Sequence, residues 1–489
     1  MTFKFIKPFT AKFKAKTGNS SRTLLWGEAV EVLDQSGDPI QVKVWGEEGS
    51  IAAADLTDRS LLEVYVIDVG QGDGILIKTP EGKWHLVDAG AAHLNQMTYK
   101  GTANFLRWKF LTALGLSKVS LANVIVTHPD ADHFGGMIDV FSGKLIGKDP
   151  FVVEVENFYH CGMGRFKEKP ELGERVSGEV APFPKGNHGI KPAGSFITEL
   201  LEDKNSFSNP PRQLAKEFAE YAGWVSKVPG TVRRLSGLDG YLPGYTPADR
   251  NEVNIRILGP VLEQIIGGKP GLRWLGDESV TRNGHSIVLR LDFGQARILL
   301  TGDLNEVSQR LLLSYYPEEE FTVDVAKGCH HGSEEVDWDF VKAMKARATV
   351  ISSGDNETFS HPRPVILGAS AHYGRESKGA DGKLLPPLVY STELARSVNL
   401  AFAKSVEVNL DASPGGTPPS PQKVKPEDTI LKLSEKESKE RDLKNTPVAA
   451  GLVYGLVNIR TDGQHILCAT LKESGNDFDV KVFKAGVSP

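Results

Sequence analysis

Cysteine is scarce in this sequence. The 489 residues include only three, Cys161, Cys329 and Cys468, and these lie far apart. So few cysteines exclude the disulfide framework that holds many small secreted domains together. The first residues also lack the apolar core of a signal peptide, and no apolar run approaches the roughly 20 residues that cross a bilayer as a helix. We therefore expect a cytoplasmic protein without membrane insertion.

A large excess of basic residues is also missing. The chain has 57 lysines and arginines against 62 acidic residues, a net charge of −5, so its composition alone does not indicate nucleic-acid binding. Two local basic clusters stand out, and each fits either a phosphate-binding face or an ordinary solvated one. The first contains Lys4, Lys7, Lys12, Lys14, Lys16 and Arg22, and the second contains Lys204, Arg212, Lys216, Lys227, Arg233 and Arg234.

The length of the chain predicts two or three structural units. Residues 1–58 alternate short apolar and polar stretches between glycine-rich turns, a pattern typical of a small all-β barrel. The order of these stretches is similar to that of bacterial SH3-like domains, with Gly27 and Trp45 near their usual places. Such a barrel would bind a protein partner or serve only as a packing appendage.

The segment from His128 to His133 is the strongest chemical signal in the chain. Its four potential metal ligands, His128, Asp130, Asp132 and His133, fall within six residues, directly after a β-branched strand pattern at 122–127. A strand end followed by a tight loop lets alternating side chains converge on one point. Imidazole and carboxylate together suit a divalent transition metal. The sequence therefore predicts a metal site here.

Four further motifs flank this loop: Asp68-Val-Gly-Gln-Gly-Asp73 with Val87-Asp-Ala-Gly90, Leu300-Thr-Gly-Asp303, Lys327-Gly-Cys-His-His-Gly-Ser333, and Ser352-Ser-Gly-Asp-Asn356 with Ser360-His-Pro362. Together with the loop, and in this order along the chain, they resemble the metallo-β-lactamase-fold hydrolases. The set looks like the soluble hydrolase domain of ComEC-type competence DNA-uptake proteins. The resemblance covers roughly residues 62–372 and resumes weakly near 449–486.

The resemblance implies an α/β fold, a four-layer αββα sandwich, preceded by the small all-β barrel. The hydrolase is expected over residues 61–410, with a long glycine- and proline-rich insertion at about 139–280 that is a source of specificity. Residues 411–447 read as a charged, proline-rich linker or insertion. Residues 448–489 are expected to supply C-terminal strands that complete the hydrolase.

The same resemblance implies a centre of two divalent ions, zinc or manganese. His128 and Asp130 would hold one ion, Asp132 and His133 the other. Asp303 would bridge the two ions, and His330 would complete the second site. Many relatives have histidine where this chain has Asp130, and a carboxylate there moves the preference from zinc toward manganese.

Other residues are expected to support catalysis, which depends on Asp132 and on His361. His361 would donate a proton to the leaving oxygen or hold a phosphoryl oxygen. Asp88 would orient a metal-bound histidine from behind, and His331 is either a similar supporting residue or an alternative proton donor. His285 is a candidate metal ligand, a substrate contact or an inert loop residue. Asp68 and Asp73 are expected to support the region by hydrogen bonds, with plain solvation at a strand end as the alternative.

The function that follows is hydrolysis of a phosphodiester by a hydroxide held between two metal ions. The substrate implied by the resemblance is nucleic acid, most of all DNA, in DNA processing or defence. A small-molecule hydrolase acting on a cyclic nucleotide, lactone or β-lactam is the alternative. A non-catalytic nucleic-acid-binding module is a third reading, opposed by the intact ligand motifs.

Overall fold

A computed structural model describes residues 2–17, 21–95, 101–249, 252–354, 359, 361–392, 455–472 and 477–486. It also gives short strands between them: β26 (Val406–Val408), β27 (Gln422–Val424), β28 (Ile430–Lys432) and β29 (Glu440–Asp442). The chain divides into one unit of residues 1–395 and 453–489 and a second of residues 396–452. In the second, β26 pairs with β27 and β28 with β29. Most of the predicted linker at 411–447 lies outside the described residues.

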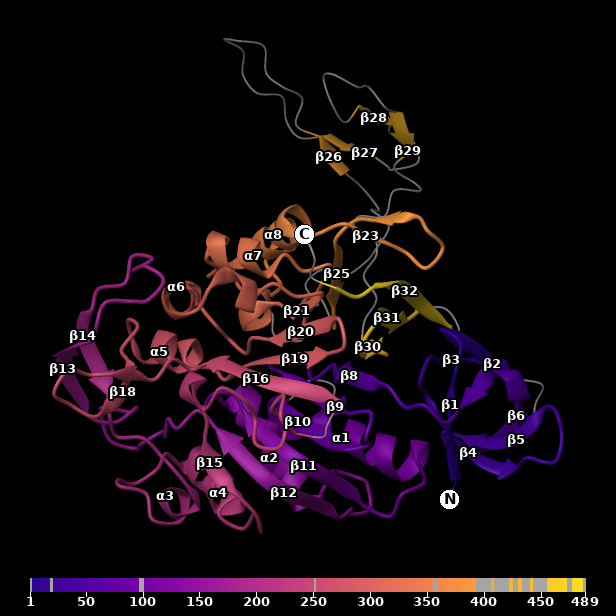
Figure 1. The fold of residues 1–489 in the computed structure, drawn as a ribbon, viewed down its shortest axis with the longest axis horizontal. Helices are drawn as coiled ribbons and strands as arrows, with labels where there is room; N and C mark the ends of the chain where they lie inside the picture. The colour runs from indigo at the N-terminus through magenta and orange to yellow at the C-terminus, as the bar shows by residue number, and fades with distance from the viewer. Residues whose placement is uncertain are drawn as a thin grey trace. The chain divides into compact units, whose positions relative to one another are not determined.

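Two sheets form the centre of the first unit (Figure 1). The nine-stranded sheet has the order β15-β12-β11-β10-β9-β8-β30-β31-β32, and the six-stranded sheet has the order β16-β19-β20-β21-β22-β25. The first consists of β8 (Leu62–Val66), β9 (Gly74–Lys78), β10 (Trp84–Ala89), β11 (Val119–Val126), β12 (Val153–His160), β15 (Val232–Arg234), β30 (Val457–Thr461), β31 (His465–Leu471) and β32 (Phe478–Lys484). The second consists of β16 (Val253–Gly259), β19 (Val288–Phe293), β20 (Ala296–Leu300), β21 (Val325–Lys327), β22 (Ala348–Ile351) and β25 (Leu388–Ser391).

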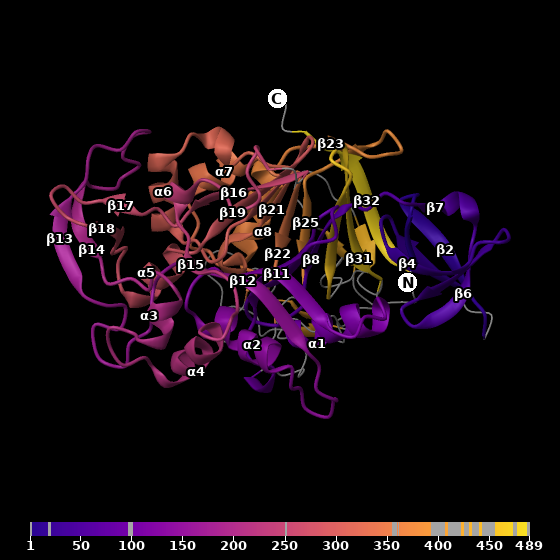
Figure 2. The same cartoon turned by 60° about the horizontal axis from the view of Figure 1, so that its bottom comes forward.

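Helices cover the outer face of each sheet. On the nine-stranded sheet lie α1 (Thr102–Arg107), continued by a π-helical turn at Trp108–Ala113, α2 (Ala131–Ser142) and α4 (Lys216–Val225). On the six-stranded sheet lie α6 (Glu306–Tyr315), α7 (Trp338–Met344) and α8 (Pro364–Tyr373). Figure 2 shows the sheets and helices from a second direction.

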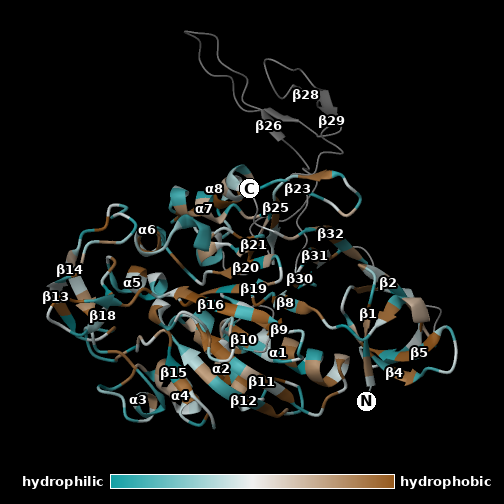
Figure 3. Cartoon of the chain, in the orientation of Figure 1, coloured by the Kyte–Doolittle hydropathy of each residue, from teal (hydrophilic) through white to brown (hydrophobic). Residues whose placement is uncertain are grey.

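Alternation along the strands explains why four layers form. In β8, Val64 and Val66 belong to the core between the two sheets, whereas Tyr65 belongs to the core beneath the helices. Both faces of the strand are therefore apolar, as expected for a sheet buried on both sides. Figure 3 shows hydrophobic residues concentrated on the central strands. The predicted αββα sandwich is confirmed.

The segment predicted as an insertion, 139–280, is more mixed than expected. It contains β12 and β15, which are strands of the nine-stranded sheet, and the start of the six-stranded sheet at β16. Outside the two main sheets it adds a four-stranded sheet and two helices. These are β13 (Arg175–Glu179), β14 (Ala193–Ile197), β17 (Glu263–Gln264), β18 (Pro270–Arg273), α3 (Lys204–Ser208) and α4. Elsewhere, β23 (Ser377–Lys378) and β24 (Leu384–Leu385) pair with each other.

The N-terminal residues form a separate all-β module with its own apolar core. Its seven-stranded sheet has the order β3-β2-β6-β5-β4-β1-β7. The identity of this module as an SH3-like barrel stays a prediction. Its strands are β1 (Thr2–Ile6), β2 (Thr10–Ala15), β3 (Ser21–Leu25), β4 (Ala29–Asp34), β5 (Ile40–Val44), β6 (Glu47–Ile51) and β7 (Leu56–Thr57).

A buried ion-pair network joins this module to β30 of the nine-stranded sheet and to the π-helical turn after α1. The carboxylate of Glu28 accepts hydrogen bonds from Lys109 Nζ at 2.9 Å, from Arg460 Nη2 at 2.6 Å and from Trp45 Nε1 at 3.2 Å. Burial raises the pKa of Glu28, but the charges of Lys109 and Arg460 outweigh it and hold that pKa well below its usual range. Glu28 therefore stabilises the folded chain in its ionised form.

None of the helices in the described segments combines the length and apolar character that a bilayer crossing needs.

Replacing Glu28 with glutamine should lower the free energy of unfolding by about 3–5 kcal/mol, because Lys109 and Arg460 would stay buried without their counter-charge. Since the pKa is depressed on folding, this contribution is complete above the pKa of the unfolded carboxyl and is lost as the pH falls below it. Urea denaturation at pH 7 measures the effect. Glu48→Gln is the control, because Glu48 pairs with Lys16 on the surface and should change stability by less than about 1 kcal/mol. Equal effects of the two variants would contradict the assignment.

Candidate metal centre

Loops at the ends of strands from both sheets bring the predicted residues together. Strand β11 ends at Val126, and α2 begins at Ala131 with Asp130 as its N-cap residue. Asp132 and His133 therefore lie in the first turn of α2. From the other sheet, Asp303 follows β20, and His330 and His331 follow β21. Close packing holds the parts in place: a Cβ at Gly72 would lie 1.9 Å from the carbonyl oxygen of Asp132.

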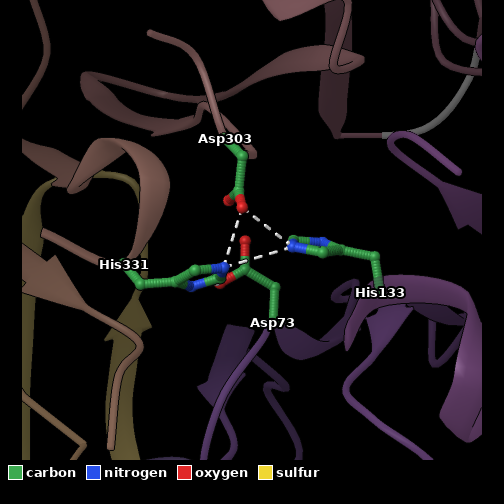
Figure 4. A group of neighbouring side chains, drawn as sticks. All are labelled: Asp73, His133, Asp303 and His331. Atoms are coloured by element: carbon green, nitrogen blue, oxygen red, sulfur yellow. Dashed lines mark hydrogen bonds and ion pairs between the residues drawn. The ribbon is translucent and has the colours of Figure 1, made fainter. Parts of the chain in front are cut away.

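Asp73, His133, Asp303 and His331 form a buried group whose potential ligand atoms all lie within 4.8 Å of one another (Figure 4). Asp303 Oδ2 lies 3.1 Å from His133 Nε2 and 2.8 Å from His331 Nε2, and the two nitrogens are 3.3 Å apart. Tetrahedral ligands at zinc-ligand bond lengths are separated by about 3.3 Å. The three atoms thus fit a divalent ion. Asp132 Oδ2, 3.7 Å from His331 Nε2, is in reach as a further ligand.

The electrostatics of the group favour a bound cation. Burial lowers the pKa of His331, but the carboxylate of Asp303 outweighs it and raises that pKa to about 9. His133 behaves in the same way, because Asp303 and Asp88 raise its pKa well above the usual value against the effect of burial. The carboxylates therefore create a strongly negative buried environment, which is the condition for metal binding by neutral imidazoles.

Asp88 supports His133 from behind. Its Oδ2 lies 2.8 Å from His133 Nδ1, and it also accepts hydrogen bonds from Thr127 N at 2.8 Å and Thr127 Oγ1 at 2.6 Å. Asp88 has a φ of 55° at a bulge between β10 and β9. A β-bulge re-aims a side chain, and a non-glycine residue with positive φ is strained. The hydrogen bond leaves Nε2 of His133 as the atom that faces Asp303.

Lys327 is a buried cation beside the group. Its Nζ contacts Asp73 Oδ2 at 2.6 Å, the carbonyl oxygen of Gly302 at 2.7 Å and Asp303 Oδ1 at 3.4 Å. Three acceptors match the three donors of an ammonium group. Asp303 therefore presents Oδ1 to Lys327 and Oδ2 to the histidines, and Asp73 is engaged by the lysine.

His128 and Asp130 form a wider second arrangement. His128 Nε2 is buried without a hydrogen-bond partner, 3.8 Å from Asp130 Oδ2 and 4.0 Å from Asp303 Oδ2. Its Nδ1 lies 3.2 Å from Ser286 Oγ. An unpartnered buried nitrogen aimed at two carboxylates fits a metal ligand. Asp130, however, also contacts Nε of Arg282 through its Oδ1.

The structure places His331, rather than His330, in the buried group. His330 is partly exposed, and its Nε2 lies 3.3 Å from Asn283 Nδ2. Both histidines have positive φ, 46° and 53°, so the backbone turns sharply between them. Residue type and position in the motif suit either histidine, and the turn selects the one that points inward. His331 is therefore the stronger candidate ligand.

The remaining predicted residues lie at different depths. His285 is buried, with Nε2 2.7 Å from the carbonyl oxygen of Arg273, outside the group of Figure 4. His361 is 8% exposed, and its ring centroid lies 5.9 Å from that of His330 and 6.4 Å from that of His331. His361 thus lies beside the two histidines of the turn after β21.

Sequence reasoning missed Lys327 and gave Asp73 only a supporting role. The sequence around each of these two residues contains a signal that could have revealed its role. Lys327 ends the apolar strand β21, and a charged residue at the end of a buried strand needs a counter-charge. Asp73 lies between Gly72 and Gly74 in a turn packed against the segment from His128 to His133, which we call the metal loop.

The two neighbouring histidines give a direct test of the geometry. His331→Asn should weaken binding of Mn²⁺ or Zn²⁺ by more than the roughly 10–100-fold that loss of a supporting hydrogen bond costs, because it removes a ligand. His330→Asn should change the affinity by less than about threefold on the same argument. Isothermal titration of chelator-treated protein measures both. A larger loss in His330→Asn would show that the turn selects the other histidine.

Part of the chain matches a known protein family. Residues 67–195 match the profile of the metallo-beta-lactamase superfamily. ComE operon protein 3 of Bacillus subtilis (strain 168) is 29% identical over 91 residues, which are 18% of this chain and only 12% of that protein.

Three solved structures are similar at 12% identity. They are the metallo-beta-lactamase fold protein YhfI of Bacillus subtilis (TM-score 0.27, 60% of this chain and 85% of that one), Zn²⁺-bound PqqB of Methylobacterium extorquens (0.25, 58% and 76%) and a long form RNase Z from yeast (0.25, 60% and 37%). Residues 67–195 match a domain of the metallo-β-lactamase superfamily, whose members are generally metal-dependent hydrolases.

Proposed function

We propose that this protein is a metal-dependent phosphodiesterase that cleaves nucleic acid, most of all DNA. The observation that carries the proposal is the buried group of Asp303, His133 and His331, with Asp132 in reach. The resemblance of its motifs to the hydrolase domain of ComEC-type proteins, together with the short match to ComE operon protein 3, supports a phosphodiester substrate.

His133, Asp303 and His331, with Asp132, would hold one divalent ion, and His128 and Asp130 would hold a second with Asp303 between them. Zinc or manganese held there would polarise the phosphoryl group and supply the hydrolytic nucleophile. The carboxylate of Asp130 in place of a second imidazole favours manganese at the second position. Asp132 is itself oriented by Gln71, whose Nε2 donates to Asp132 Oδ2 at 3.2 Å.

His361 would act on the substrate directly. Its ring lies beside those of His330 and His331 and stacks on Phe359 at 5.8 Å with an interplanar angle of 23°. Phe359 is 47% exposed, so it forms an outer wall that limits where the imidazole can turn. From this place the imidazole would hold a phosphoryl oxygen or deliver a proton to the leaving oxygen.

Purified protein with manganese or zinc should cut closed circular single-stranded DNA or plasmid DNA, as measured by gel electrophoresis. Asp132→Ala should abolish cutting, because it removes a carboxylate from the centre, while Asp149→Ala, an exposed aspartate outside the centre, should cut normally. Binding of about two ions per chain without cleavage of any DNA form would contradict the proposal. A small-molecule phosphodiester, lactone or β-lactam would then be tested in the same way.

His361→Asn should lower the cleavage rate by about 10²–10⁴-fold, the usual contribution of a positioned acid–base group. It should leave metal affinity unchanged, since His361 is outside the group of ligand atoms. The matched control is His372→Asn, because His372 is an exposed histidine on α8. Rates come from single-turnover cleavage and affinities from titration. A parallel loss of metal binding would make His361 a ligand instead.

A further inference from the structure

A wide cleft lies in the part of the chain between the metal loop and β16. It has a volume of about 960 Å³, at the upper end of the roughly 300–1,000 Å³ typical of small-molecule sites. Its floor is apolar: Pro210, Ala215 and Ala219 are at least partly exposed there, while the lining residues Phe166, Leu214 and Ala222 are themselves buried. Three lysines, Lys167, Lys169 and Lys216, also line the cleft. Among the described residues that line it, Glu171 is the only acidic one.

Two connections fix this cleft to the metal loop. The first is apolar: Phe134, the residue after His133, packs on Phe218 and Tyr221 of α4, with ring centroids 5.4 and 5.0 Å apart. Since α4 also supplies Ala219 and Ala222 to the floor, the cleft and the metal loop share one packed core.

The second connection is a chain of charges through Arg282 on α5 (Glu278–Gly284). Its guanidinium contacts Asp130 of the metal loop on one side. On the other side its Nη1 lies 3.6 Å from Oε1 of Glu171, which lines the cleft. Arg282 therefore lies between the candidate metal centre and the cleft.

The charges along this path leave a surplus on the cleft wall. Arg165, Lys169 and Arg282 are balanced by Glu171, Glu278 and Asp130, which they contact. Lys167 and Lys216 are exposed, and neither has a carboxylate within 4 Å among the residues that the structure describes. Glu168 and Glu217, which follow them in the sequence, do not line the cleft. The cleft wall therefore carries two solvated ammonium groups without a carboxylate partner, although the net charge of the chain is −5.

We propose that this cleft binds a single strand of nucleic acid and leads it past Arg282 to the metal centre. The proposal rests on the nuclease function above and adds the path of the substrate. Solvated lysines at the wall match a phosphate backbone, and an apolar floor matches exposed bases. In a duplex the bases are stacked and paired, so they cannot reach such a floor.

The double variant Lys167→Gln with Lys216→Gln tests the path. Its matched control is Lys342→Gln with Lys378→Gln, two exposed lysines on α7 and β23 that remove the same charge away from the cleft. The probe is a fluorescein-labelled 12-residue deoxythymidine strand in EDTA, so that binding is measured by anisotropy without cleavage. We expect Kd to rise about tenfold in the cleft variant, and the slope of log K against log salt to fall by about 1.4, since each lost phosphate contact on a single strand is worth about 0.7.

Competition then identifies the ligand. An unlabelled duplex should compete weakly, and a ribonucleotide strand of equal length distinguishes RNA from DNA. Ala219→Glu adds a carboxylate to the exposed face of α4 in the cleft. This variant should also weaken binding, although it replaces no lysine.

The outcomes separate this path from the nuclease function. If the wild type cleaves DNA but the cleft and control variants bind equally, or a duplex competes as well as a single strand, the path is wrong and the nuclease stands. If the cleft variant loses binding while no metal supports cleavage, the cleft stands as a binding site for a single strand and the nuclease function falls. If the wild type neither binds nor cleaves, both fall.

Discussion

The carboxylate of Asp303 is the point on which the rest of the centre depends. It is 2% exposed and contacts His133 and His331 through one oxygen and Lys327 through the other. An ionised carboxylate buried in this way is stable only with cations or donors around it. Because these partners come from α2, β21 and the turn after β21, the ionised Asp303 holds loops of the two sheets together. The fold and the metal centre are thus stabilised by the same contacts.

The architecture and the loop from His128 to His133 could be predicted from sequence patterns, because both depend on local regularities. Val64, Tyr65 and Val66 form an apolar run, which predicts a strand buried on both faces, and the spacing from His128 to His133 predicts a metal site. The choice between His330 and His331 could not be made in this way. Two left-handed residues in succession reverse the direction in which side chains point. The backbone there is held by a hydrogen bond from His330 N to the carbonyl oxygen of Gly302 and by close packing of Gly332 against Ile351, and residue type predicts neither contact. Lys327 was missed for a similar reason, since its partner Asp73 is 254 positions away in the numbering.

The limits of the predicted insertion could also not be determined from the sequence pattern. Glycine and proline are frequent throughout 139–280, yet β12 pairs in parallel with β11 within this range. Parallel pairing joins strands separated by a helix, and nothing local to β12 announces its partner. What is peripheral to the two sheets is smaller: β13, β14, β17, β18, α3 and the cleft beside α4. Of this part, the cleft is connected to Asp130 through Glu171 and Arg282.

Three of the six non-glycine residues with positive φ in the described segments lie at the candidate centre, whereas Trp45, His188 and Lys345 lie elsewhere. Asp88, His330 and His331 all have positive φ, and all three lie within the centre or next to it. Such conformations persist only where surrounding contacts determine them, and here those contacts are hydrogen bonds to Thr127, Ser352 and Asn283. If the backbone at Asp88 relaxed, its carboxylate would turn away from His133. The hydrogen bond that holds a proton on Nδ1 of that ring would then be lost. The hydrogen bonds of Asp88 to His133 and of His331 to the carbonyl oxygen of Ser352 therefore fix Nε2 as the nitrogen that each of these two rings presents to Asp303.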